Sequence, residues 1–187
     1  MHIGLEIHNA CLRKCIADNH GYEVKTVGDS FVVAFHNVVD AAAFMLRAQY
    51  ALLQQPWSEA LLKLPNCEEQ FIDKTVYDKG ALLWRGLRVR MGCHVGEVDR
   101  EYVDITGRVD YFGPPVNMAA RVESMAHGGE ILISEACYEL LRNVYPESMS
   151  CVGIRIRTSV FLAFFLFGVR LYFCNTRVLQ AQLPVST

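Results

Sequence analysis

The hydrophobic pattern of the first fifty residues changes from a helical period to a period of two and back. Apolar positions at helical spacing predict an amphipathic helix over residues 2–19. Two runs rich in β-branched and aromatic residues follow, at 22–27 and 30–35, and the Gly28-Asp29 pair between them favours a tight turn. We therefore expect a β-hairpin, followed by a second helix in the Ala- and Leu-rich segment 39–53.

The later elements alternate around a polar interruption. Prolines, charges and a glycine crowd the segment 56–85, which is typical of an insertion on the surface. Further along we expect strands at 87–97 and 102–111, a helix from Pro114-Pro115 to the His127-Gly128-Gly129 stop, a strand at 130–134 and a helix at 135–143. This order predicts an α+β fold with helices on a mainly antiparallel sheet.

Charge divides the chain into two parts. Residues 1–148 hold 14 basic and 20 acidic side chains, a net charge of −6, whereas 149–187 hold four arginines and no acid. We interpret the first part as one domain and the second as a divergent basic and apolar tail. The apolar run 160–169 has about half the length that a helix needs to cross a bilayer. An altered reading frame, a buried strand and an anchor on a membrane surface all stay open as explanations of the tail.

Composition excludes several classes of function. A net charge of −2 argues against a protein that binds nucleic acid by neutralising phosphates. Seven cysteines, roughly 4% of the chain, are too few for a disulfide scaffold and indicate reduced thiols in a cytosolic setting. Cys11 and Cys15, four apart on the first helix, are expected to pack rather than to bind a metal, because no further ligand is near in sequence.

Four polar residues become candidates for chemistry when they are considered together. Lys25 projects from the first strand of the hairpin and Asp29 lies in its turn, although each alone fits an ordinary surface position. Asn117 and Arg121 share one helix face, opposite an apolar stripe of Met118, Val122 and Met125. An amide beside a guanidinium offers several donors suited to phosphate or sugar oxygens, but an exposed helix face explains the same spacing.

Three segments together resemble the catalytic domain of class III nucleotide cyclases. They are Glu23-Val-Lys-Thr-Val-Gly-Asp-Ser-Phe, Arg88-Val-Arg-Met-Gly-Cys-His-Val-Gly-Glu and Asp110-Tyr-Phe-Gly-Pro-Pro-Val-Asn-Met-Ala-Ala-Arg-Val-Glu-Ser, in the family's order. The resemblance covers residues 1–148 and is strongest for the receptor-type adenylate cyclases of trypanosomatid parasites. It implies the family's ferredoxin-like fold.

The resemblance implies an adenylate cyclase, which converts ATP to 3′,5′-cyclic AMP and pyrophosphate. Lys25 and Asp110 match the residues that hydrogen-bond adenine. The chemistry agrees, because an ammonium can donate to a ring nitrogen and a carboxylate can accept from the exocyclic amine. Asn117 matches the asparagine that orients the ribose, and Arg121 the arginine that stabilises charge on the reacting phosphate.

Family sites use two divalent ions, Mg²⁺ or Mn²⁺, bridged by two aspartates. Asp29 matches one of these. The other belongs to a strand before the first helix, which this sequence does not contain, and the family's phosphate-binding lysine belongs to a late hairpin, whereas the tail has no lysine. We therefore expect a sheet without its first strand, with unpaired edges beside the gap, and a chain that lacks parts of the site.

Sites of this family form between two catalytic domains, so a homodimer that binds ATP is expected. Membrane attachment is expected only through regions outside this chain, with the domain facing the cytoplasm. Two alternatives stay open: a cyclase-like module that dimerises or binds nucleotide without turnover, and a small α+β RNA-binding domain. The second needs exposed aromatics on the central strands, whereas Phe31 and Phe35 lie where a core is expected.

Overall fold

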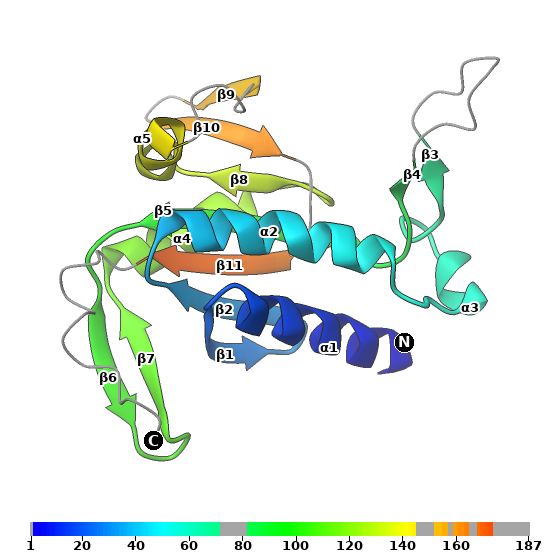
Figure 1. Cartoon of the computed structure of the whole chain (residues 1–187), viewed down its shortest axis with the longest axis horizontal. Helices are drawn as coiled ribbons and strands as arrows, with labels where there is room; N and C mark the ends of the chain where they lie inside the picture. Colours follow the sequence, from blue (N-terminus) through cyan, green and yellow to red (C-terminus); the bar gives the residue numbers. More distant parts are fainter. Residues whose placement is uncertain (1, 72–81, 145–151, 157–158, 165–167, 174–187) are drawn as a thin grey trace.

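The computed structural model describes residues 2–71, 82–144, 152–156, 159–164 and 168–173, which form one large sheet with helices on both faces (Figure 1). In spatial order the seven strands of this sheet are β1 (Tyr22–Val27), β2 (Ser30–Phe35), β11 (Gly168–Phe173), β5 (Arg90–Val95), β8 (Ile131–Ile133), β10 (Ser159–Phe164) and β9 (Val152–Ile156).

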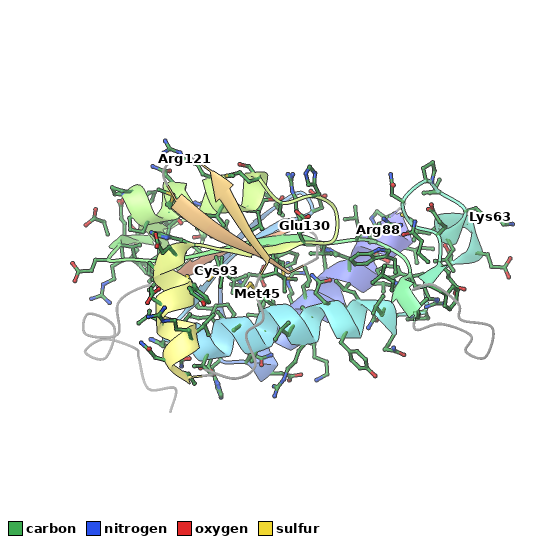
Figure 2. The ribbon with its side chains drawn as sticks, turned by 90° about the horizontal axis from the view of Figure 1, so that it is seen from above. Met45, Lys63, Arg88, Cys93, Arg121 and Glu130 are labelled. Carbon is green, nitrogen blue, oxygen red and sulfur yellow. The ribbon has the colours of Figure 1, made fainter. Side chains whose placement is uncertain are left out.

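Four helices cover the sheet. α1 (His2–Asp18), α2 (Val38–Leu53) and α5 (Glu135–Val144) share a hydrophobic core on one face, and α4 (Pro114–Ser124) packs on the other. Figure 2 shows this division, because Met45 of α2 and Arg121 of α4 lie on opposite sides of the sheet. None of the helices within the described residues is long and apolar enough to cross a membrane.

The hairpin forms one edge of the sheet, where β1 is the outer strand and β2 carries most of the buried side chains. Phe31, Val33 and Phe35 are buried against α1 and α2, while Val32 and Ala34 are buried in a second cluster on the opposite face. A strand that is covered on both faces has apolar residues at successive positions, and β2 has such a sequence. The exposed fractions of Phe31 and Phe35 are 0% and 2%, so the aromatic platform that an RNA-binding domain requires is absent from β2.

The predicted strand at 102–111 is wrong. That segment instead contributes to two strands, β6 (Asp99–Val103) and β7 (Arg108–Phe112), which pair with each other and form a hairpin separate from the main sheet. The turn between them includes Gly107, whose φ of 63° suits glycine. Period-two alternation continues on both sides of this short turn, and for that reason the sequence pattern conceals it.

The expected insertion at 56–85 begins with α3 (Glu59–Leu62) and continues through β3 (Gln70–Phe71) and β4 (Leu82–Trp84). These elements project beyond one end of the sheet (Figure 1). Trp57 and Trp84 are buried at its two ends, and Trp57 Nε1 donates to the main-chain oxygen of Leu52 at 2.9 Å. The two indoles therefore anchor the insertion to the body of the domain.

The expectation of unpaired edges beside a missing central strand is wrong. Strand β11, from the predicted tail, lies between β2 and β5 and runs parallel to both. Three of the six strand pairings of the sheet are therefore parallel, and the sheet is mixed rather than mainly antiparallel. Strands β9, β10 and β11 lie within the predicted tail, whose origin stays open, and the rest of 149–187 lies outside the described residues.

Candidate functional site

Lys25 of β1 and Asp110 of β7 form an ion pair at the surface. Nζ of Lys25 lies 2.6 Å from Oδ2 of Asp110, and the amide of Tyr111 donates to the other oxygen, Oδ1, at 2.8 Å. Lys25 Nζ also lies 5.8 Å from the centroid of the Phe112 ring. The structure thus brings together the two residues that the sequence assigned to one role, with the carboxylate oriented by two donors.

Helix α4 presents the second pair of predicted residues. It begins after Gly113, whose φ of 113° few other residues adopt, with Pro114 and Pro115 in its first turn. Asn117 and Arg121 are exposed on its outer face. The opposite face is apolar as predicted, because Val122 is buried in a cluster with Leu132 that Met118 and Met125 flank.

Two contacts fix α4 against strand β5. The side chain of Glu123 is only 5% exposed and accepts from Arg90 Nε at 2.7 Å, which ties the end of α4 to the start of β5. Gly92 lets the helix approach closely, since a Cβ at this position would overlap the backbone of Glu123. The outward pair on α4 is therefore held by a rigid support.

Asp29 lies exposed in the turn between β1 and β2, separate from the pairs on β7 and α4. Its charge acts on the buried His8 of α1, although burial outweighs this attraction and lowers the pKa of His8. Within the described residues, no group of three or more His, Cys, Asp or Glu side chains could hold a metal ion. Asp29 is the residue that the resemblance assigns to metal ions, and a site with two ions needs a second carboxylate to bridge them.

A network that the sequence did not reveal surrounds the Lys25–Asp110 pair. Tyr22 and Glu23 of β1 contact β7, and Arg13 of α1 and Arg108 of β7 converge on Glu23. These residues are far apart in the chain and are of types that are common on protein surfaces. Only Glu23 could have been singled out from the sequence, because it begins the Glu-Val-Lys motif. His94, in contrast, forms a hydrogen bond with Ser134 Oγ at 2.9 Å, so its ring has a structural partner.

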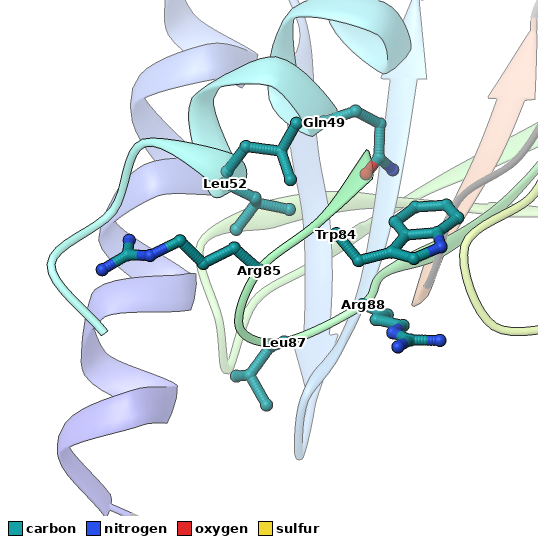
Figure 3. A pocket seen from close by; sticks show the side chains of 7 residues that line it. Gln49, Leu52, Trp84, Arg85, Leu87 and Arg88 are labelled. Atoms are coloured by element: carbon teal, nitrogen blue, oxygen red, sulfur yellow. The ribbon is translucent and has the colours of Figure 1, made fainter. Parts of the chain in front are cut away.

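One pocket lies away from these residues, beside the insertion (Figure 3). It is lined by Gln49, Leu52, Leu53, Trp84, Arg85, Leu87 and Arg88. Its cavity volume of about 10 Å³ is far smaller than the roughly 300–1,000 Å³ typical of pockets that enclose drug-sized ligands. None of the five predicted site residues lines it, and of these Lys25, Asn117 and Arg121 are exposed on β1 and α4.

Comparisons with known proteins point to one family. A family model described as the adenylate and guanylate cyclase catalytic domain matches residues 2–162. An adenylate cyclase of Mycosarcoma maydis is 43% identical over 157 residues, which cover 82% of this chain and 6% of the relative. The receptor-type adenylate cyclase B of Leishmania donovani is 34% identical over 148 residues, which cover 73% of this chain and 11% of the relative.

A solved structure extends the likeness to the fold. A Trypanosoma brucei adenylate cyclase in its monomeric state superposes with a TM-score of 0.70 at 30% identity, covering 89% of this chain and 78% of that one. The chain spans only a small part of the curated relatives that it matches, about a tenth of their length or less. The match to the family model over residues 2–162 nevertheless shows that the chain belongs to the adenylate and guanylate cyclase catalytic domain family.

Proposed function

We propose that this chain is the catalytic domain of an adenylate cyclase, which converts ATP to 3′,5′-cyclic AMP and pyrophosphate. The observation that carries the proposal is the ion pair between Lys25 and Asp110. It sets an ammonium donor beside a carboxylate acceptor, and adenine offers a ring-nitrogen acceptor beside an amine donor. Guanine presents the reverse order, so the pair favours ATP over GTP.

The residues of α4 act on the rest of the nucleotide in this proposal. The ribose O3′ attacks the α-phosphorus, a new O–P bond forms, and the bond from this phosphorus to pyrophosphate breaks. Asn117 orients the ribose, and Arg121 stabilises the negative charge that develops on the phosphate. Preorganised donors of this kind commonly contribute about 3 kcal/mol each in the transition state. Their exposure on a rigid helix supports these roles.

The open form of the surface supports a site shared between two copies of the chain. A nucleotide bound to an exposed surface needs a second surface to enclose it. In a homodimer each protomer would provide that surface for the nucleotide of its partner. In this arrangement Asp29 of one protomer faces the Lys25, Asp110, Asn117 and Arg121 set of its partner. The hairpin of β6 and β7 exposes Tyr102 and Ile105, the latter 97% exposed, which is in keeping with an interface.

Divalent ions, Mg²⁺ or Mn²⁺, are implied by the family relationship and would neutralise charge on the entering and leaving oxygens. Asp29 is the residue that the resemblance assigns to them, and within the described residues no group of three or more His, Cys, Asp or Glu side chains could hold a metal ion. A chain without a second metal aspartate would perform a second candidate function, that of a cyclase-like domain that binds nucleotide without turnover. The absence of a second metal aspartate and of a phosphate-binding lysine stays a prediction from the resemblance. Attachment to a membrane, with the domain facing the cytoplasm, is proposed only through regions outside this chain.

A turnover assay separates the two functions. The purified chain is incubated with ATP and Mn²⁺, cyclic AMP is measured, and binding of 3′-deoxy-ATP, which lacks the attacking hydroxyl, is measured in parallel. Cyclic AMP formation that rises faster than linearly with protein concentration supports a dimeric cyclase. Binding of the analogue without cyclic AMP supports the second candidate, and neither binding nor turnover overturns both.

A further inference from the structure

Strand β7 is held against β1 by side chains rather than by a ladder of backbone hydrogen bonds. The two strands belong to different sheets. The amide of Val109 donates to the hydroxyl of Tyr22 at 3.0 Å, and Nη1 of Arg108 donates to the main-chain oxygen of Glu23 at 3.1 Å. Together with the Lys25–Asp110 ion pair and the packing of buried Tyr111 against Val24, these contacts attach the β6–β7 hairpin to β1.

Glu23 is the centre of this attachment. Its carboxylate accepts from Arg13 Nε at 2.9 Å and Nη2 at 3.0 Å, and from Thr26 Oγ1 at 2.7 Å. Arg108 Nη1 lies 3.9 Å from the same carboxylate. The hydrogen bonds from Arg13 lower the pKa of Glu23, which keeps its charge in place. Glu23 therefore joins α1, β1 and β7 at one fixed point.

The attachment is in register with the base-reading pair. Glu23 and Lys25 stand two residues apart on β1, and their partners Arg108 and Asp110 stand two residues apart on β7. Buried Tyr111 holds one side of Asp110, and Arg108 holds the other, so the place of the Asp110 carboxylate relative to Lys25 Nζ depends in part on how Arg108 is bound. An ion pair with a lysine that is 45% exposed is weak by itself and would not hold this geometry.

We infer that Arg108 and Glu23 are positioning residues that set the distance between Lys25 and Asp110, and thereby the choice between adenine and guanine. The inference rests on the proposed function of that pair. Neither residue needs to touch the base. A site that hydrogen-bonds adenine rejects guanine strongly only while its donor and acceptor are held in place. If β7 were loosened, the preference for ATP over GTP would fall.

The test compares Arg108→Ala with a matched control, Arg85→Ala. Arg85 makes the same kinds of contact in the insertion, to the Glu69 carboxylate at 3.0 Å and the main-chain oxygen of Gln55 at 2.6 Å. Dissociation constants of 3′-deoxy-ATP and 3′-deoxy-GTP, which lack the attacking hydroxyl, are measured for each protein in Mn²⁺. We expect Arg108→Ala to lower the preference for ATP about tenfold, Arg108→Lys to restore part of it, and Arg85→Ala to leave it unchanged.

The ratio of the two constants separates positioning from general damage, because a merely structural defect weakens both nucleotides alike. Glu23→Gln, which preserves the shape of the side chain, gives a second variant that should also lower the ratio. An unchanged ratio in Arg108→Ala and Glu23→Gln, with the original chain still selective for ATP, overturns this inference alone. A lack of ATP preference in the original chain overturns the proposed function and this inference with it.

Discussion

Lys25 and Asp110 are separated by 85 residues in the chain, and yet Lys25 Nζ and Asp110 Oδ2 lie 2.6 Å apart. The fold, rather than local sequence, makes this contact, because it places β1 beside β7. The donor and the acceptor are already side by side, so each can give up its hydrogen bond to the other and bind a base that offers the matching acceptor and donor. The predictions below follow from this pair, from the helix beside it and from the sheet that supports both.

The double variant Lys25→Glu with Asp110→Cys should shift nucleotide preference from ATP toward GTP. A carboxylate on β1 can accept from guanine, and removal of the Asp110 carboxylate removes the acceptor that adenine needs. Relative binding or turnover of the two nucleotides measures the shift. Lys14→Glu with Asp18→Cys is the control, since that exposed pair has the same 2.6 Å separation on α1. An unchanged ratio of ATP to GTP binding or turnover in the double variant would contradict the roles of Lys25 and Asp110 in recognising the base.

Replacement of Asn117 or Arg121 by alanine should lower kcat about 100-fold or more and change KM for ATP much less. These side chains are assigned to charge and geometry that develop in the transition state. Steady-state kinetics of cyclic AMP formation measure both constants. Arg142→Ala and Asn143→Ala, on the exposed face of α5, serve as controls that should leave kcat unchanged. Equal losses in kcat and affinity would assign the pair to ground-state binding.

Gly92→Ala should lower both the stability and the activity of the domain. The added Cβ overlaps the backbone of Glu123, so α4 must move away from β5, at a cost of about 1–3 kcal/mol in the free energy of unfolding. Gly4→Ala is the control, because its Cβ would meet only the end of the Leu61 side chain, which can turn aside. Denaturant unfolding of both variants measures the difference; equal stability would mean that α4 tolerates a larger separation.

The contribution of Glu23 to stability should depend on pH. Its pKa in the folded chain lies below the ordinary value of 4.5, chiefly because of the hydrogen bonds from Arg13. The contribution is therefore present above pH 4.5 and is lost as the pH falls through the folded value. Glu23→Gln should be less stable than the original chain by about 1 kcal/mol at pH 7. The difference should shrink in acid, and one that stays constant from pH 7 to pH 3 would show that the charge has no role.

Leu171→Pro should destabilise the fold strongly. Leu171 pairs with Val33 on one side and Cys93 on the other, and proline removes a donor from a strand bonded along both edges. A loss of about 3 kcal/mol corresponds to a fall of about 10 °C in the unfolding midpoint. Ile154→Pro on β9, the outermost strand, should have a smaller effect. Equal midpoints for the two variants would show that β11 does not support the sheet.

Local pattern allowed the prediction of the first hairpin and of α2, because turn residues and a change of period mark their ends. It also allowed the prediction that Met118 and Val122 face the core while Asn117 and Arg121 face outward. The β6–β7 turn was missed because alternation continues past it. The binding partners of Glu23 could not be predicted, since contacts between Arg13, Glu23 and Arg108 depend on topology and leave no spacing in the sequence.

Strand β11 gives the domain an unusual order of assembly. It is the last described strand along the chain and yet lies between β2 and β5 in space. During synthesis both neighbours leave the ribosome long before residues 168–173 are made. The nascent domain must therefore keep a gap open in its middle, in the state most prone to capture by chaperones. The middle of the sheet is therefore completed last, and the domain cannot reach its native structure until residues 168–173 have been translated.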